Sequence, residues 1–148
     1  MSPPDNTEEP SLAEPARPLV LVVDDDEGIR DSLRDLLEDA GFDTLGARHG
    51  LEALNLLAML PIAPAFILLD LMMPVMDGWA FCDNRQKSRT FSDVPVIAIS
   101  AADISESDRP AGVDAFLAKP IDANKFARLA VRMVGRKLAA ARSSRVVH

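Results

Sequence analysis

Cysteine and histidine are scarce in this sequence, and that scarcity narrows the chemistry it can carry. The single cysteine, Cys82, permits no disulfide within the chain and is typical of a reducing compartment such as the cytosol. The two histidines, His49 and His148, have no partners at metal-ligand spacing, so we interpret both as surface residues. The sequence therefore excludes an internally disulfide-bonded fold and offers no histidine-based metal centre.

The sequence also lacks a long hydrophobic segment and a secretory signal. Its longest nearly apolar stretch, Leu56 to Leu69, has 14 residues and contains Pro61 and Pro64, so it is too short to span a bilayer. The first residues are acidic and proline-rich, where a signal peptide needs a basic and then an apolar segment. We therefore expect a cytoplasmic protein with no membrane association.

The residues that are present fit one soluble domain with a tail at each end. The chain has 148 residues, of which 48% are hydrophobic and 26% are charged, enough for a single core. Residues 1–18 hold five prolines and four acidic residues, so we expect them to be disordered. We place the folded domain at 19–141 and a flexible tail at 142–148. The net charge of −7 argues against a nucleic-acid partner.

Unbroken apolar runs alternate with helical patterns along the folded part. The runs at 19–23, 66–69 and 94–99 are typical of strands buried on both faces of a parallel sheet, and we expect weaker strands at 43–47 and 114–118. Helical spacing predicts helices at 27–40, 51–60, 79–87 and 105–112, and a last helix from about residue 122. Five strands alternating with five helices predict an α/β fold with a doubly wound parallel sheet.

Several residues mark the expected ends and faces of these helices. Asp26 and Asp122 are candidate N-caps, and Gly41 is placed to end the first helix. Arg85 falls where the apolar face of the third helix should continue, so we expect its stem to lie along that face and its charge to reach water.

Polar side chains follow the long strands at their carboxyl ends. The first strand ends in Asp24 and Asp25, the third in Asp70, the fourth in Ser100 and the fifth in Lys119. Carboxylates gathered at one edge repel by roughly 4 kcal/mol per pair at 4 Å and an effective dielectric of 20. Mg²⁺ would relieve this repulsion, because it prefers carboxylate oxygens. With the lysine, such a site attracts a phosphoryl group, which Asp70 could accept as a nucleophile.

Four short motifs carry a resemblance to a known family. They are Val-Val-Asp-Asp at 22–25, Leu-Leu-Asp followed by Met-Pro and Asp-Gly at 68–78, Ile-Ser-Ala at 99–101 and Ala-Lys-Pro at 118–120. In this order, each closing a strand, they make the chain resemble a receiver domain of the response regulators of two-component phosphorelays, of the stand-alone type. The match covers about residues 19–138.

The resemblance implies a flavodoxin-like (βα)5 fold with strand order 2-1-3-4-5 and a role for each motif. Asp70 is then the phosphoacceptor. Asp25 and Asp70 bind Mg²⁺ directly, Asp24 assists through water, and Met72 contributes its backbone carbonyl.

The other implied positions surround the phosphoacceptor. Lys119 binds the phosphoryl group, Ser100 and Phe116 are the switch pair, and the bond before Pro120 is cis. The implied phosphoryl donor is a sensor histidine kinase or a histidine phosphotransfer protein, and a downstream protein reads the switched surface.

Two departures from the family pattern bear on this interpretation. Position 72 is often polar in the family and is an apolar Met72 here, which leaves the lifetime of the phosphoryl group open. The segment from Ser100 to Lys119 is shorter than usual and contains Pro110, so we expect a truncated or distorted fourth helix.

Less specific interpretations compete with these roles. Helix capping alone would explain one of the three consecutive aspartates, most simply Asp26. Lys119 would then be an ordinary surface lysine. A metal-dependent aspartyl phosphatase needs a second aspartate two residues after Asp70, where Met72 stands. A phosphorylation-independent interaction module with the receiver fold is the main alternative function.

The last helix concentrates positive charge in an acidic chain. Residues 123–148 contain seven Lys or Arg and no acidic residue, and the helical pattern turns Lys125, Arg128, Arg132 and Arg136 outward. A solvated basic face is the simple interpretation. The functional hypothesis is that a downstream partner with an acidic surface docks on Arg128 and Arg132 beside Phe116, with nucleic acid the weaker alternative.

Overall fold

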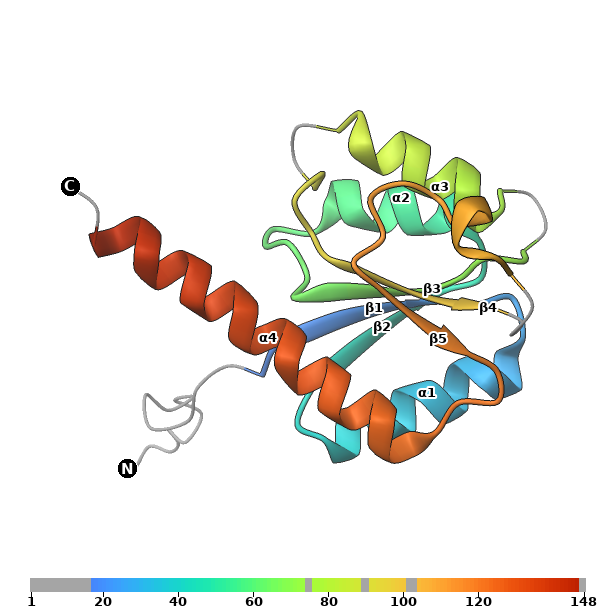
Figure 1. The fold of residues 1–148 in the computed structure, drawn as a ribbon, viewed down its shortest axis with the longest axis horizontal. Helices are drawn as coiled ribbons and strands as arrows, with labels where there is room; N and C mark the ends of the chain where they lie inside the picture. Colours follow the sequence, from blue (N-terminus) through green and yellow to red (C-terminus); the bar gives the residue numbers. More distant parts are fainter. Residues whose placement is uncertain (1–16, 74–75, 89–90, 101–103, 147–148) are drawn as a thin grey trace, which may run out of the picture.

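A computed structural model describes residues 17–73, 76–88, 91–100 and 104–146. Its centre is a five-stranded parallel sheet in the order β2-β1-β3-β4-β5, with helices on both faces (Figure 1). In chain order the elements are β1 (Leu19–Val23), α1 (Glu27–Asp39), β2 (Asp43–Ala47), α2 (Gly50–Met59), β3 (Phe66–Asp70), α3 (Gly78–Gln86), β4 (Val96–Ser100), the 3₁₀ turn η2 (Glu106–Asp108), β5 (Ala115–Ala118) and α4 (Ala123–Val146). The predicted α/β class and the strand order 2-1-3-4-5 are confirmed.

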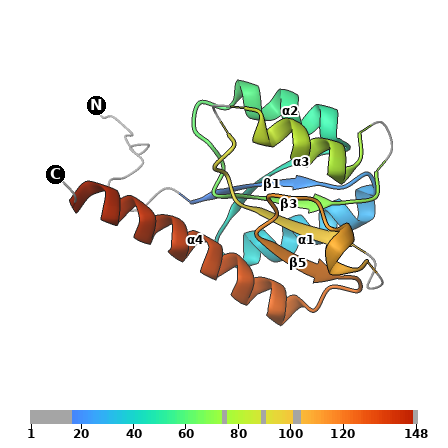
Figure 2. The same cartoon turned by 45° about the horizontal axis from the view of Figure 1, so that its top comes forward.

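The central strands are apolar throughout because both of their faces are covered. Every residue of β3 and of β4 is buried. Side chains of a strand alternate between faces, so β1 and β3 supply two separate clusters. One cluster packs against α1 and α4, and the other packs against α2 and α3 (Figure 2). No helix among the described residues is long and apolar enough to cross a membrane.

The helix ends follow the capping residues. The Asp26 carboxylate accepts a hydrogen bond from the backbone N–H of Ile29 at 3.0 Å, and Asp122 caps α4 through Asn124 and Lys125. Gly41 follows α1 with φ +101°, a conformation that strains residues with a Cβ atom. These three predicted signals are confirmed. His49 is also an N-cap, since its Nδ1 accepts from the N–H of Glu52 at 3.2 Å, a role that the surface interpretation missed.

The prediction of five α-helices is wrong. Between β4 and β5 the described residues hold only the single 3₁₀ turn η2, where a helix over 105–112 was expected. Pro110 lacks the backbone N–H that a helix needs, and Gly112 adopts φ +84°, so the segment cannot form regular helix through these positions. The helix was expected to be truncated or distorted, and among the described residues it is reduced to this one turn.

The predicted domain boundaries differ from the structure at both ends. Arg17 belongs to the folded unit, because its guanidinium donates to the carbonyls of Glu38, Gly41 and Phe42. Residues 1–16, the rest of the predicted N-terminal tail, lie outside the described residues. At the other end α4 continues past residue 141 to Val146, where a tail was expected to begin. The helix formers Ala139 to Arg142 favour that extension.

Candidate functional site

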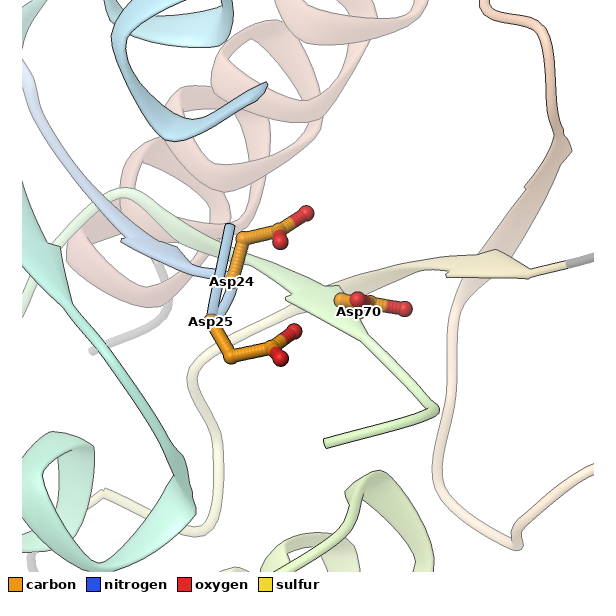
Figure 3. Close-up of side chains that lie close together, drawn as sticks. All are labelled: Asp24, Asp25 and Asp70. Carbon is orange, nitrogen blue, oxygen red and sulfur yellow. The ribbon is translucent and has the colours of Figure 1, made fainter. Parts of the chain in front are cut away.

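Three carboxylates meet at the carboxyl edge of the sheet. β1 and β3 are neighbours in register, with Val23 opposite Leu69, so Asp24 and Asp25 leave β1 next to Asp70 at the end of β3. The three side chains each offer an oxygen within 4.8 Å of the others (Figure 3). The adjacency predicted from strand ends is therefore present in the fold.

Asp24 is the most deeply buried of these carboxylates, with 1% of its surface exposed. Its Oδ1 accepts a hydrogen bond from the N–H of Asp26 at 2.9 Å. Its Oδ2 is buried and has no hydrogen-bond partner among the described residues. Burial raises the pKa of Asp24 to about 6, and the neighbouring charge of Asp70 adds to that rise.

The backbone of Asp24 is held from two sides. Its N–H donates to the carbonyl of Ala47 at 3.1 Å, and the Arg30 guanidinium donates to its carbonyl at 2.8 Å. The backbone of the acidic loop is therefore fixed to β2 and to α1 at Asp24.

Asp70 is 3% exposed and has two donors on Oδ1. The backbone N–H of Met72 lies at 3.2 Å and the Lys119 ammonium at 3.5 Å. Burial raises the pKa of Asp70, while the Met72 N–H and the Lys119 charge counteract part of that rise. The Met72 side chain itself points to solvent, with 63% of its surface exposed.

Ser100 and Lys119 are brought to the same edge by the pairing of β4 with β5. Ser100 is opposite Ala118, and the backbone N–H of Lys119 donates to the Ser100 carbonyl at 2.9 Å. Ser100 is buried, and the Lys119–Pro120 peptide bond is cis. The predicted hydroxyl thus lies at the end of β4, the strand next to that of Asp70, and the predicted ammonium follows β5, one strand further along.

Phe116 lies on β5, half-buried, in a setting that sequence reasoning did not foresee. The guanidinium of Arg109, just after η2, lies over its ring at 4.2 Å from the ring centre. Trp79 on α3 donates from Nε1 to the Asp108 carbonyl at 2.8 Å. A guanidinium over an aromatic face is attractive. Arg109 and Trp79 therefore hold the η2 segment against β5 and α3.

Arg85 was expected to send its charge to water, and that prediction is wrong. Its side chain is buried and donates to the backbone carbonyls of Ser92 and Gly112, the second at 2.7 Å. The two loops around β4 present carbonyls that no strand satisfies, and an internal guanidinium satisfies them. Its position on the apolar face of the helix was the available signal.

The donor set of the acidic cluster fits a hard divalent cation. Three carboxylate oxygens lie close together, and one buried oxygen, Oδ2 of Asp24, lacks a partner among the described residues. Mg²⁺ binds through a few carboxylates and keeps several waters, so a half-open cluster suits it. Pro74 and Ala101 of the predicted motifs lie outside the described residues, as does the side chain of Arg136.

Comparison with known proteins gives a consistent family assignment. The family model for the response regulator receiver domain matches residues 20–130. The response regulator MprA of Mycobacterium sp. (strain KMS) is 43% identical in an alignment of 105 residues that covers 68% of this chain and 44% of that protein. This chain therefore aligns with less than half the length of that relative.

Solved structures share the fold over nearly their whole length. The receiver domain of a Francisella response regulator is 31% identical, with a TM-score of 0.73, over 82% of this chain and 99% of its own. The receiver domain of a sensor histidine kinase from Pseudomonas aeruginosa, described with a magnesium ion coordinated in its active site cleft, has a TM-score of 0.73. It covers 81% of this chain and 99% of its own at 24% identity, so this likeness shows the fold alone.

Proposed function

The chain belongs to the family of response regulator receiver domains of two-component systems, and from that premise we propose that Asp70 accepts a phosphoryl group from a phosphohistidine. One observation carries the proposal. Asp70 is a buried carboxylate that lies 3.5 Å from the Lys119 ammonium and shares its edge of the sheet with Asp24 and Asp25.

The proposed transfer uses Asp70 as a nucleophile. One carboxylate oxygen attacks the phosphorus of the donor, an O–P bond forms, and the P–N bond to the histidine ring breaks with its electrons staying on the nitrogen. Lys119 offsets negative charge on the phosphoryl oxygens, and the Ser100 hydroxyl donates a hydrogen bond to one of them. Proteins of this family are signalling switches, and the transfer serves to set the switch.

We propose that Mg²⁺ is held by the carboxylates of Asp24, Asp25 and Asp70 and by the backbone carbonyl of Met72. The bound ion would neutralise charge shared by the carboxylates and the incoming phosphoryl oxygens. The chain's own part is to keep the three carboxylates together without the ion. Arg30 and Ala47 do this by fixing the backbone of Asp24.

The donor protein needs a docking surface beside Lys119, and the fold provides a hollow there. It measures about 500 Å³ and lies between α1 and the turn from β5 to α4. Ile29, Leu36 and Ile121 give it an apolar wall, and Lys119 lies at its edge. We propose that a histidine-bearing helix of a sensor kinase or a phosphotransfer protein packs into it.

The proposed output runs through Ser100 and Phe116. A phosphoryl group on Asp70 attracts the Ser100 hydroxyl, and movement of Ser100 gives the Phe116 ring room to turn inward. The ring then leaves the Arg109 guanidinium that covers it in this structure. The η2 segment loses one of its attachments, and the surface beside β5 changes for a downstream partner.

Intact-mass measurement after incubation with acetyl phosphate tests the proposal. Wild type should gain one phosphoryl group with Mg²⁺ and none in EDTA, and Asp70→Asn should gain none. The control Asp93→Asn, an exposed carboxylate away from the site, should label like wild type. Labelling that persists in Asp70→Asn, or that ignores EDTA, overturns the proposal. A wild type that never labels supports the phosphorylation-independent interaction module instead.

A further inference from the structure

Helix α1 carries a stripe of four carboxylates, one per turn. Glu27, Asp31, Asp35 and Asp39 follow one another at i, i+4 spacing, and all four are exposed. Like charges at this spacing destabilise a helix by roughly 0.2–0.5 kcal/mol per pair. None of the four forms an ion pair among the described residues. We call them the acidic stripe.

The two cations of the same helix do not neutralise this stripe. The Arg30 guanidinium turns toward the sheet and donates to the Asp24 carbonyl at 2.8 Å. Arg34 donates from Nε to the Thr44 hydroxyl at 3.1 Å. Both arginines are half-buried, and their bonds fix α1 to the loop after β1 and to β2. The negative charge of the outer face of α1 therefore has no counterpart on that helix.

Helix α4 carries the opposite charge. Lys125, Arg128 and Arg132 are exposed and form no ion pair with any described residue. We call these three the basic ridge. Arg128 and Arg132 flank Ala127 and Val131, which line a shallow hollow of about 480 Å³. Val131 is 60% exposed, so its apolar side chain is open to contact on this face.

The stripe and the ridge belong to one surface of the molecule. α1 and α4 contact each other and cover the same face of the sheet. Leu33 and Leu37 of α1 share one buried cluster with Phe126 and Ala130 of α4. Their outward faces therefore form a single surface that is acidic on one helix and basic on the neighbouring one.

We propose that this surface binds a second copy of the same chain, with α1 of each copy against α4 of the other. A two-fold axis between the helices makes both contacts identical and places each acidic stripe on a basic ridge. The stripe spans about 18 Å and the ridge about 10 Å, so the ridge fits within the stripe. Ala127 and Val131 supply the apolar contact between the charges.

The charge pattern favours a second copy over a different acidic protein. An acidic protein that covers the basic ridge also meets the acidic stripe on the neighbouring helix, and like charges in contact are unfavourable. A second copy, turned by the two-fold axis, meets opposite charge on both helices. The pairing therefore assigns a partner to Arg128 and Arg132 that carries both signs of charge.

A charge-swap experiment tests the pairing. One variant carries Arg128→Glu and Arg132→Glu, so two of its three ridge positions are acidic, as its stripe is. The other carries Asp31→Lys and Asp35→Lys, so the two central positions of its stripe are basic, as its ridge is. Sedimentation velocity should show that wild type self-associates and that each variant alone does so about tenfold more weakly or worse. An equimolar mixture should form a one-to-one dimer, which native mass spectrometry identifies, because both contacts then join opposite charges.

The control variant carries Asp83→Lys and Lys87→Glu, which reverses an exposed ion pair on α3. It should self-associate like wild type. Raising salt from about 20 mM to about 500 mM should weaken the wild-type dimer, because exposed charges are screened. Circular dichroism of each variant confirms that it is folded, so this test does not depend on phosphorylation of Asp70.

Two outcomes overturn the pairing. One is a wild type that stays monomeric at sub-millimolar concentration and low salt, which leaves the basic ridge to an acidic protein of another sequence. The other is a mixture of the two variants that stays monomeric although circular dichroism shows that each variant is folded.

Discussion

The buried carboxylate of Asp24 allows a quantitative prediction of the free energy of unfolding in the absence of metal. Burial raises its pKa from an ordinary value of 3.8 to about 6 in the folded protein. Between these values the folded state binds more protons than the unfolded state, so the free energy of unfolding falls as pH rises. At about 1.4 kcal/mol per pKa unit, ionised Asp24 lowers the stability at neutral pH by about 3 kcal/mol. The stability gained from protonated Asp24 is fully present below about pH 4 and is lost above about pH 6.

The substitution Asp24→Asn removes the charge and keeps an oxygen that can accept from the N–H of Asp26. In EDTA at neutral pH, we expect the variant to be about 2–3 kcal/mol more stable than wild type. At about 2–4 °C per kcal/mol, its melting temperature should rise by roughly 4–12 °C. At about pH 4 the two proteins should differ little, because wild-type Asp24 is then protonated.

Urea unfolding in EDTA across this pH range measures the difference. The control Asp93→Asn changes an exposed carboxylate and should stay within about 0.5 kcal/mol of wild type at every pH. If Asp24→Asn is no more stable than wild type at neutral pH, or if its advantage survives acidification, then burial of the Asp24 charge is not the dominant effect. Saturating Mg²⁺ should stabilise wild type by about 2.7 kcal/mol at a hundred times its Kd, and the variant by less.

Three further measurements follow from side chains beneath the site. Arg85→Met should lower the free energy of unfolding by about 2 kcal/mol, because two loop carbonyls lose a charged donor. The control Lys87→Met, on the exposed face of the helix, should change it by under about 0.5 kcal/mol. Equal effects of the two substitutions would contradict this prediction. Burial raises the pKa of Cys82 to about 11, so iodoacetamide at mildly alkaline pH should modify it only in urea, and rapid native labelling would refute that. Trp79 is the only tryptophan of the sequence, and its indole N–H donates to the η2 segment. Its fluorescence should therefore change on phosphorylation, and it should change similarly in unphosphorylated Arg109→Ala. Fluorescence that neither perturbation affects would argue against release of η2.

Much of the fold could be predicted because its signals are local. The run from Phe66 to Leu69 is apolar without a break, which a strand buried on both faces requires, and Asp70 closes it. Asp26 and Asp122 cap helices because a short carboxylate before a helical pattern satisfies free N–H groups. The meeting of Asp24, Asp25 and Asp70 then follows from parallel pairing, since neighbouring strands end at one edge.

The failures concern residues whose partners lie far along the chain. Arg85 is buried because loops after α3 and before β5 present carbonyls to it, and helical periodicity contains no information about those loops. The stacking of Arg109 on Phe116 depends on how the η2 segment folds back, which local propensity does not determine. The helix expected over 105–112 is only the 3₁₀ turn η2 among the described residues. Pro110 was a local signal of this outcome, but the path of the segment is set by contacts with Trp79 and Arg85.

The identity of the phosphorylated residue is the central claim, and chemical mapping tests it directly. Wild type is phosphorylated with acetyl phosphate and Mg²⁺, the acyl phosphate is reduced with borohydride to homoserine, and peptides are sequenced by mass spectrometry. The account predicts homoserine at position 70 alone, and none after incubation in EDTA. Homoserine at position 24 or 25, or an intact Asp70 in protein that carries a phosphoryl group, would contradict it.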